Sequence, residues 1–178
     1  DRVMALLPGG GYAEEVVVQA GHCMRVPESV DLIEAAALPE VLLTVFLNVF
    51  QLAGLKSEDW VLVHGGGSGI GTAAIQLAAA AQARIAVTAG SSEKCGRCLD
   101  LGADLAINYR EEDFAEVIGK ATDGQGVSVI LDSIGGSYMN QNLASLDTGG
   151  RLVLIGLMGG AKAEVPLGLL LTKRLQII

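Results

Sequence analysis

A glycine-rich segment between an apolar run and an alanine-rich run is the part of the sequence best suited to chemistry. It reads VLVHGGGSGIGTAA over residues 61–74. Glycines let a strand turn sharply into a helix and let a ligand approach the backbone, because no Cβ lies in the way. The first turn of the helix then offers unpaired N–H groups and a partial positive charge, which suit a pyrophosphate. This strand–loop–helix context predicts a dinucleotide-binding loop.

Other families with glycine loops fit these residues less well. A nucleoside-triphosphate loop needs a Lys where Thr72 stands in the register of Gly66 and Gly71. A methyltransferase loop needs an acidic residue at the end of the second strand, and there is none. Short-chain dehydrogenases need a Tyr-x-x-x-Lys pair, and no tyrosine here has a Lys four residues later. The dinucleotide interpretation is therefore favoured.

The residues after the second expected strand indicate which dinucleotide is preferred. NAD-binding folds place Asp or Glu about 20 residues past the loop, where it binds the ribose hydroxyls. The corresponding residue here is Gly90, so no carboxylate would repel a 2′-phosphate. Ser91 can offer a hydrogen bond and Lys94 a charge, while Glu93 can point to another side of the helix. The pattern predicts NADPH rather than NADH.

Regular elements must position this loop. Apolar runs without polar alternation, interleaved with helical runs, predict a parallel sheet covered on both faces. Right-handed crossovers then give an α/β doubly wound (Rossmann) fold. The expected strands are residues 60–64, 84–88, 105–108, 127–131, 151–155 and 175–178, and the expected helices are 69–81, 92–101, 111–121, 137–146 and 167–171.

The N-terminal residues have a different pattern. Residues 3–7 and 15–18 are strand-like and are separated by a turn-rich loop. Asp31 can cap a helix, Pro39 is expected to break it, and a buried helix is expected from Val41 to Ala53, where Gly54 ends it. We therefore place a domain boundary between residues 34 and 35.

Composition excludes several functional classes. The 178 residues include 12 Lys and Arg against 20 Asp and Glu, so the formal charge of −8 argues against nucleic-acid and anionic-membrane partners. Only 18% of residues are charged, which argues against disorder. Three cysteines and no recognisable signal peptide favour a reducing, cytoplasmic location. No apolar run reaches the length of a transmembrane helix.

Several segments together resemble one known family. They are residues 1–14, 35–40, 61–66, 108–114 and 130–136. They are similar to the zinc-free quinone oxidoreductases, the zeta-crystallin-like branch of the medium-chain dehydrogenase/reductase superfamily. Residues 155–160, IGLMGG, are most similar to the tumour-suppressor-inducible type. The resemblance implies that residues 1–34 are the tail of a GroES-like β-barrel domain. Residues 35–178 would then be an NADPH-binding Rossmann domain, incomplete at its C-terminus, in an internal part of a longer protein.

The resemblance also implies cofactor contacts, residue by residue. Four residues would contact the pyrophosphate through the backbone, three would surround the adenosine 2′-phosphate, and four would border the nicotinamide. In that order they are Gly67, Ser68, Gly69 and Ile70; Ser91, Lys94 and Tyr109; and Thr44, Gly156, Leu157 and Met158. The family's substrate-facing residues lie outside this chain, so no catalytic residue is assigned here.

A metal site is not expected. Cys95 and Cys98 form a single pair at helical spacing, and His22, Cys23 and His64 are distant in sequence. A structural zinc ion takes four ligands.

The sequence therefore predicts an NADPH-dependent oxidoreductase that transfers a hydride to a quinone or a similar electrophile without a metal. An enoyl or alkenal reductase of the same superfamily, or a non-catalytic NADPH-binding protein, stays open as an alternative. The resemblance implies a homodimer through the edge of the Rossmann sheet, with Leu175–Ile178 as an unpaired edge strand. The strand patterns of residues 1–30 are expected to lack partners within the chain. The isolated chain is expected to bind NADPH without turning over quinone.

Overall fold

The computed structural model describes all residues from 1 to 178. By its internal contacts the chain divides into two compact units, Asp1–Thr44 and Val45–Ile178. The predicted boundary between residues 34 and 35 lies earlier, at the end of helix α1 (Leu32–Ala35). The assignment of the two parts to a barrel tail and a cofactor domain stays a prediction.

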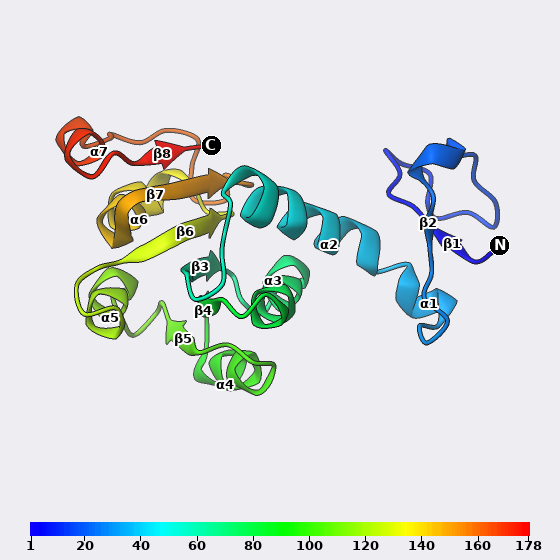
Figure 1. Ribbon diagram of the computed structural model, residues 1–178, viewed down its shortest axis with the longest axis horizontal. Helices are drawn as coiled ribbons and strands as arrows, with labels where there is room; N and C mark the ends of the chain where they lie inside the picture. Colours follow the sequence, from blue (N-terminus) through cyan, green and yellow to red (C-terminus); the bar gives the residue numbers. More distant parts are fainter. The chain divides into compact units, whose positions relative to one another are not determined.

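The N-terminal unit is a small β arrangement followed by helices (Figure 1). β1 (Val3–Met4) pairs antiparallel with β2 (Met24–Arg25), which follows a short 3-10 helix, η1 (Ala20–His22). The expectation that these strands lack partners is thus wrong for β1, and residues 15–18 form no strand. The predicted cap of α1 is confirmed, because the Asp31 carboxylate accepts a hydrogen bond from Ile33 N at 2.8 Å.

The break expected at Pro39 lies just before it. Residues 36–37 form a turn, and Pro39 occupies the first turn of α2 (Leu38–Val45), where no intrahelical N–H partner is lost. The helix continues as a π-helix, η2 (Phe46–Leu52), and the chain turns at Gly54 with φ +64°. A helix from Val41 is therefore present, with a wider second half, but the expectation that it is buried is wrong, since Phe46 and Leu52 are each 50% exposed.

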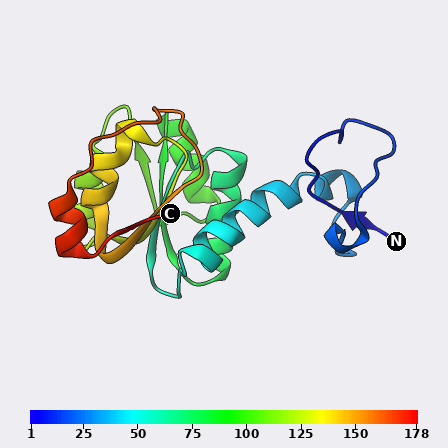
Figure 2. The ribbon, with the colours of Figure 1, turned by 90° about the horizontal axis from the view of Figure 1, so that it is seen from above.

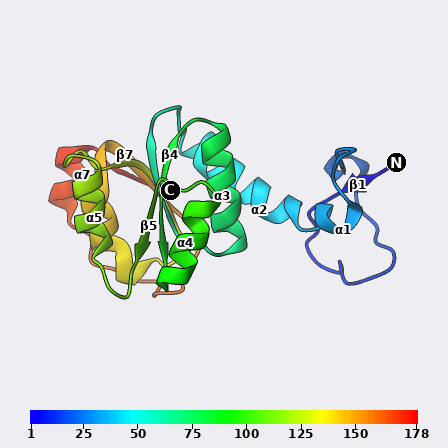
Figure 3. The same cartoon turned by 90° about the horizontal axis from the view of Figure 1, so that it is seen from below.

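The C-terminal unit contains the predicted doubly wound α/β fold. Its six parallel strands lie in the order β5-β4-β3-β6-β7-β8. Their bounds are β3 Trp60–His64, β4 Arg84–Ala89, β5 Leu105–Asn108, β6 Val127–Asp132, β7 Leu146–Leu154 and β8 Gln176–Ile177. Figures 2 and 3 show α3 (Gly69–Ala80) and α4 (Ser92–Asp100) on one face of the sheet. The other face is covered by α5 (Phe114–Ala121), α6 (Met139–Ser145) and α7 (Leu167–Lys173).

Burial explains why the strands are apolar throughout. Leu62, Ile85, Ile107, Ile130 and Leu152 come from five neighbouring strands and are all fully buried. A sheet with helices on both faces exposes neither side of its strands, so no polar alternation is needed.

Three predicted elements differ most from the structure. Helix α5 begins at Phe114 rather than at Glu111, because the Asp113 carboxylate caps it by accepting from Ala115 N at 2.8 Å. The predicted helix 137–146 is split into a 3-10 turn, η3 (Gly136–Tyr138), and α6. The strand expected at 151–155 begins earlier, at Leu146.

The C-terminal strand is paired on one side. Ile178 N donates to Leu152 O and Leu154 N donates to Ile178 O, both at 2.9 Å. The prediction of an unpaired strand is wrong for this side, whereas the other side of β8 is an edge of the sheet. None of the helices has the length and apolar composition needed to cross a bilayer.

Candidate functional site

The glycine loop joins the centre of the sheet to the start of α3. Gly65 turns the chain with φ +78°, and Ser68 caps α3 by accepting a hydrogen bond from Gly71 N at 3.0 Å. The hydroxyl of Ser68 is thus used within the loop. The N–H groups of Gly67, Gly69 and Ile70 have no protein acceptor. These free donors belong to the residues predicted to contact a pyrophosphate through the backbone.

Packing divides the glycines of the loop into two groups. A Cβ at Gly71 would clash with the carbonyl oxygen of Gly65 and lie 2.6 Å from Gly66 Cα. A Cβ at Gly66 would lie 2.6 Å from the Cβ of Val87 on β4. A Cβ at Gly67 would meet only the Lys94 stem, at 3.7 Å. Gly66 and Gly71 are therefore required by close packing, whereas Gly67 faces open space beside Lys94.

A pocket of about 250 Å³ lies beside the loop. It is lined by Gly65, Gly67, Ser68, Ala89, Gly90, Lys94 and Tyr109. The structure thus brings together the loop, the end of β4, the first turn of α4 and the residue after β5. A second pocket of about 220 Å³ shares Gly67 and Lys94 and extends between α3 and α4 to Thr72, Arg97 and Cys98.

Of the three residues predicted to surround the 2′-phosphate, two line the pocket and one does not. Lys94 and Tyr109 both line the pocket, and a Cβ at Gly90 would lie 2.7 Å from the Tyr109 hydroxyl oxygen. The Ser91 hydroxyl caps α4 by accepting from Lys94 N at 3.3 Å. Glu93 forms an exposed ion pair with Arg97 at 2.8 Å. Glu93, the acidic residue that could oppose a phosphate, is therefore paired within its own helix.

The residues after β7 that were predicted to border the nicotinamide lie on a loop that is hydrogen-bonded to the loop after β6. Met158 N donates to Ser133 O at 3.3 Å, and Gly159 N donates to Ile134 O at 2.6 Å. Leu157 and Met158 are 55% and 76% exposed, so both can meet a ligand. Thr44 is the last residue of the N-terminal unit, where its hydroxyl donates to the Glu40 carboxylate at 3.3 Å.

Sequence reasoning missed a buried polar network behind the loop. His64 is 3% exposed; its Nδ1 lies 3.1 Å from Thr88 Oγ1 and its Nε2 lies 2.7 Å from Asn142 Oδ1. Asn142 Nδ2 donates in turn to the Asp132 carboxylate at 3.0 Å. Burial lowers the pKa of His64 below its usual value, although Asn142 and Asp132 act in the opposite direction. A signal was available, because His64, Thr88 and Asp132 are the polar residues near the carboxyl ends of three apolar strands.

The cysteines of α4 are buried rather than presented to solvent. Burial is the main cause that raises the pKa of both Cys95 and Cys98. A thiol with a raised pKa is a poor nucleophile and a poor metal ligand. The structure contains no group of three His, Cys, Asp or Glu side chains placed to bind a metal ion.

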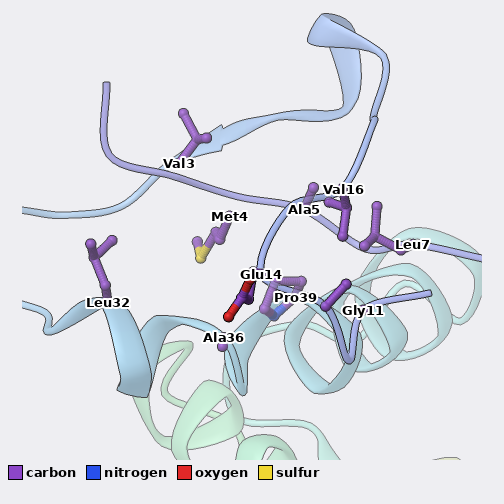
Figure 4. A pocket seen from close by; sticks show the side chains of 11 residues that line it. Val3, Met4, Ala5, Leu7, Gly11, Glu14, Val16, Leu32, Ala36 and Pro39 are labelled. Carbon is purple, nitrogen blue, oxygen red and sulfur yellow. The ribbon is translucent and has the colours of Figure 1, made fainter. Parts of the chain in front are cut away.

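The N-terminal unit has a pocket of its own, of about 330 Å³ (Figure 4). Apolar side chains such as Val3, Met4, Leu7 and Leu32 line most of it, and Glu14 supplies the one charged side chain. None of the predicted site residues lies in this pocket.

Comparisons with known proteins place the chain in a family. Residues 69–178 match the zinc-binding dehydrogenase family. Quinone oxidoreductase-like protein 2 of Bos taurus is 37% identical over 174 residues, which make up 97% of this chain and 50% of that protein. The chain thus spans about half the length of the curated relatives that it matches over nearly all of its own length.

Solved structures share the fold. Escherichia coli quinone oxidoreductase complexed with NADPH superposes with a TM-score of 0.80 at 32% identity, covering 89% of this chain and 49% of that one. An NAD-dependent alcohol dehydrogenase superposes with a TM-score of 0.87 at 34% identity, covering 95% of this chain and 49% of that one.

Proposed function

The chain belongs to the zinc-binding dehydrogenase family, within which it is of the quinone oxidoreductase type, and from this we propose that it is the NADPH-binding part of a quinone reductase. The observation that carries the proposal is the pocket at the glycine loop. Gly67, with its free N–H, lines it together with Lys94 and Tyr109, and Gly90 stands where NAD-specific folds have a carboxylate.

The residues of the loop fit a dinucleotide pyrophosphate. The N–H groups of Gly67, Gly69 and Ile70 point from a helix N-terminus, which favours negative charge. Gly67 has no side chain to block the approach of a phosphate. The absence of a Cβ at Gly71 lets α3 begin directly against Gly65 and Gly66, so the donors stay in one compact turn.

The adenosine end would be held by Lys94 and Tyr109. The Lys94 ammonium would neutralise a 2′-phosphate, and the Tyr109 hydroxyl occupies the space above Gly90, where it can donate to the same group. Ser91 would act indirectly. Its hydroxyl accepts a hydrogen bond from Lys94 N, which holds the first turn of α4 and so positions the Lys94 backbone. This division of roles favours NADPH over NADH.

The nicotinamide end would lie against Gly156, Leu157 and Met158 of the loop after β7. When bound, the nicotinamide would supply a hydride to the acceptor. The exposed side chains of Leu157 and Met158 would exclude water from that end of the site. We assign the acceptor as a quinone or a similar electrophile, with no metal, and the free edge of β8 as the surface of a cytoplasmic homodimer.

Cofactor preference tests this proposal. Lys94→Ala should weaken NADPH binding by about 1.5–3 kcal/mol, the range of a charge-assisted hydrogen bond, and leave NADH binding nearly unchanged. Gly90→Asp should shift preference toward NADH, because a carboxylate repels the 2′-phosphate and displaces Tyr109.

Fluorescence titration of the two reduced cofactors measures both effects. Lys120→Ala is the control, because Lys120 is an exposed lysine at the end of α5, on the other face of the sheet. Equal losses of NADPH and NADH affinity in Lys94→Ala would show that Lys94 does not bind the phosphate. Oxidation of NADPH by a simple para-quinone, followed by absorbance with the full-length protein, then tests the acceptor.

A further inference from the structure

The buried polar network runs without a gap from the glycine loop to the loop after β6. Gly65 N donates to both acceptors of Thr88, the carbonyl oxygen at 3.1 Å and Oγ1 at 3.3 Å, and Thr88 Oγ1 lies 3.1 Å from the His64 ring. The other ring nitrogen lies 2.7 Å from Asn142, which bonds Asp132. Each link is within hydrogen-bond distance, and Thr88, Asn142 and Asp132 are at most 1% exposed.

The hydrogen bonds have one consistent direction. Asn142 Nδ2 donates to Asp132, so Asn142 Oδ1 faces His64 and accepts from Nε2–H. In the neutral tautomer with the proton on Nε2, which the lowered pKa of His64 favours, Nδ1 accepts from the Thr88 hydroxyl. Thr88 Oγ1 can then accept from Gly65 N. Each donor atom of the network thus has an acceptor, and a fully hydrogen-bonded network of this kind is rigid.

The far end of the network holds a turn of backbone. The Asp132 carboxylate accepts from Ile134 N at 2.7 Å and from Gly135 N at 3.1 Å. That turn in turn binds the loop after β7, because Ile134 O accepts from Gly159 N at 2.6 Å and Gly160 O accepts from Gly136 N at 2.8 Å. The position of residues 156–160 therefore depends on the orientation of the Asp132 carboxylate.

Two aromatic rings fix the middle of the network. The His64 ring packs edge-on against Phe114 and Tyr138, with ring centroids 4.9 Å away in both cases. The ring therefore cannot rotate freely. If its hydrogen bond to Thr88 is lost, the ring can shift only together with Asn142, its other hydrogen-bond partner.

We propose that His64, Thr88, Asn142 and Asp132 are positioning residues that couple the glycine loop to the loop after β7. The inference rests on the proposed function: the coupling would hold the pyrophosphate and nicotinamide ends of the cofactor site at a fixed distance from each other. The network touches neither end directly. It acts through the N–H of Gly65 on one side and those of Ile134 and Gly135 on the other.

Hydrogen exchange of the unliganded chain tests the coupling. Thr88→Val removes the hydroxyl and keeps the shape, whereas Thr88→Ser keeps the hydroxyl and loses a methyl group. We expect exchange at Ile134, Gly135 and Gly159 to accelerate about tenfold in Thr88→Val relative to Thr88→Ser. Ile85 N, which donates to the Asp104 carboxylate at the other end of β4, is the reference amide and should not change.

Two results would overturn the proposal. Acceleration confined to Gly65 and Gly66 would show that the effect of Thr88 is local. Equal acceleration at all amides, Ile85 included, would show that the network contributes only to global stability. His64→Phe, which keeps a ring against Phe114 and Tyr138, is the second variant and carries the same expectations.

Ligand binding extends the test to the cofactor. We expect NADPH affinity to fall about fivefold in Thr88→Val, with Thr88→Ser close to the parent, while adenosine 2′,5′-bisphosphate binds both variants equally. Equal losses for the two ligands would refute the link to the nicotinamide end. Failure of the parent chain to bind NADPH would refute the proposed function, whereas the exchange experiment would still decide the coupling.

Discussion

Replacing Gly67 and Gly71 separately by alanine should separate cofactor binding from folding. At Gly71 the new methyl group would clash with the Gly65 carbonyl oxygen and lie 2.6 Å from both Gly66 Cα and the Gly66 carbonyl oxygen. All three obstacles are backbone atoms, so α3 and the loop must move apart. Overpacking of this kind costs about 1–3 kcal/mol, and the better helix propensity of alanine offsets up to about 1 kcal/mol of it.

At Gly67 the same methyl group meets only the Lys94 stem, at an ordinary contact distance of 3.7 Å. Alanine also lowers the conformational entropy of the unfolded chain. Where the native backbone suits alanine, this raises the free energy of unfolding by about 0.4–1 kcal/mol. The methyl group nevertheless enters the pocket that the phosphates would fill, and we expect NADPH affinity to fall at least about tenfold, or 1.4 kcal/mol. Gly67→Ala should therefore be as stable as the parent or more stable, yet bind poorly.

Urea unfolding followed by circular dichroism gives the two stabilities, and fluorescence titration gives the two affinities. Gly124→Ala does not serve as a control because Gly124 has φ +80°, whereas Gly119→Ala does, since a Cβ there meets nothing within 4 Å. The reasoning is wrong if Gly67→Ala loses as much stability as Gly71→Ala, or if it binds NADPH like the parent.

The remaining predictions concern protonation, thiol chemistry and metal. Because the pKa of folded His64 lies below 6.5, the unfolded chain binds a proton there first, so stability is complete above pH 6.5 and falls on acidification toward the folded pKa. The slope from this residue is up to about 1.4 kcal/mol per pH unit, and a His64→Gln variant with the parent's pH dependence of urea unfolding would refute it. A maleimide should label Cys23 in the native chain and leave the buried Cys95 and Cys98 unlabelled until urea is added; rapid native labelling of all three thiols, read by mass spectrometry, would contradict this. Exhaustive chelation should leave the unfolding midpoint and NADPH binding unchanged, and one equivalent of zinc released with a loss of binding would count against a metal-free site.

Local signals in the sequence predicted most of the Rossmann elements. Trp60–His64 was predicted to the residue, because its apolar run ends at glycine, and the Asp31 cap was identified from residue type and spacing. The strand at residues 15–18 was not formed, since β propensity alone supplies no pairing partner. The pairing of β8 with β7 was also missed, because it joins Arg151 to Gln176, 25 positions apart, and no local pattern encodes such a contact.

The candidate site was predictable where a motif is contiguous. Gly67 and Lys94 were expected near one ligand, and the structure places both on one pocket. The Tyr109 hydroxyl above Gly90 and the network from His64 to Asp132 were not predicted, although polar residues at three strand ends marked the network. Both depend on side chains that only the strand order brings together, such as His64 and Asn142, which are 78 positions apart.

The position of β3 in the middle of the sheet has a consequence for the order of folding. One edge of β3 pairs with β4, its next strand along the chain, but the other pairs with β6, where Val61 faces Val129. A chain emerging from the ribosome can therefore complete the first ladder once Ala89 is made, while the second edge of β3 waits for β6, which begins only at Val127. During that interval an apolar strand displays unpaired backbone groups, a template for association with another nascent chain. Long-range parallel pairing of this kind slows folding. Growing the cells at lower temperature or supplying a chaperone during synthesis should thus raise the yield of native protein.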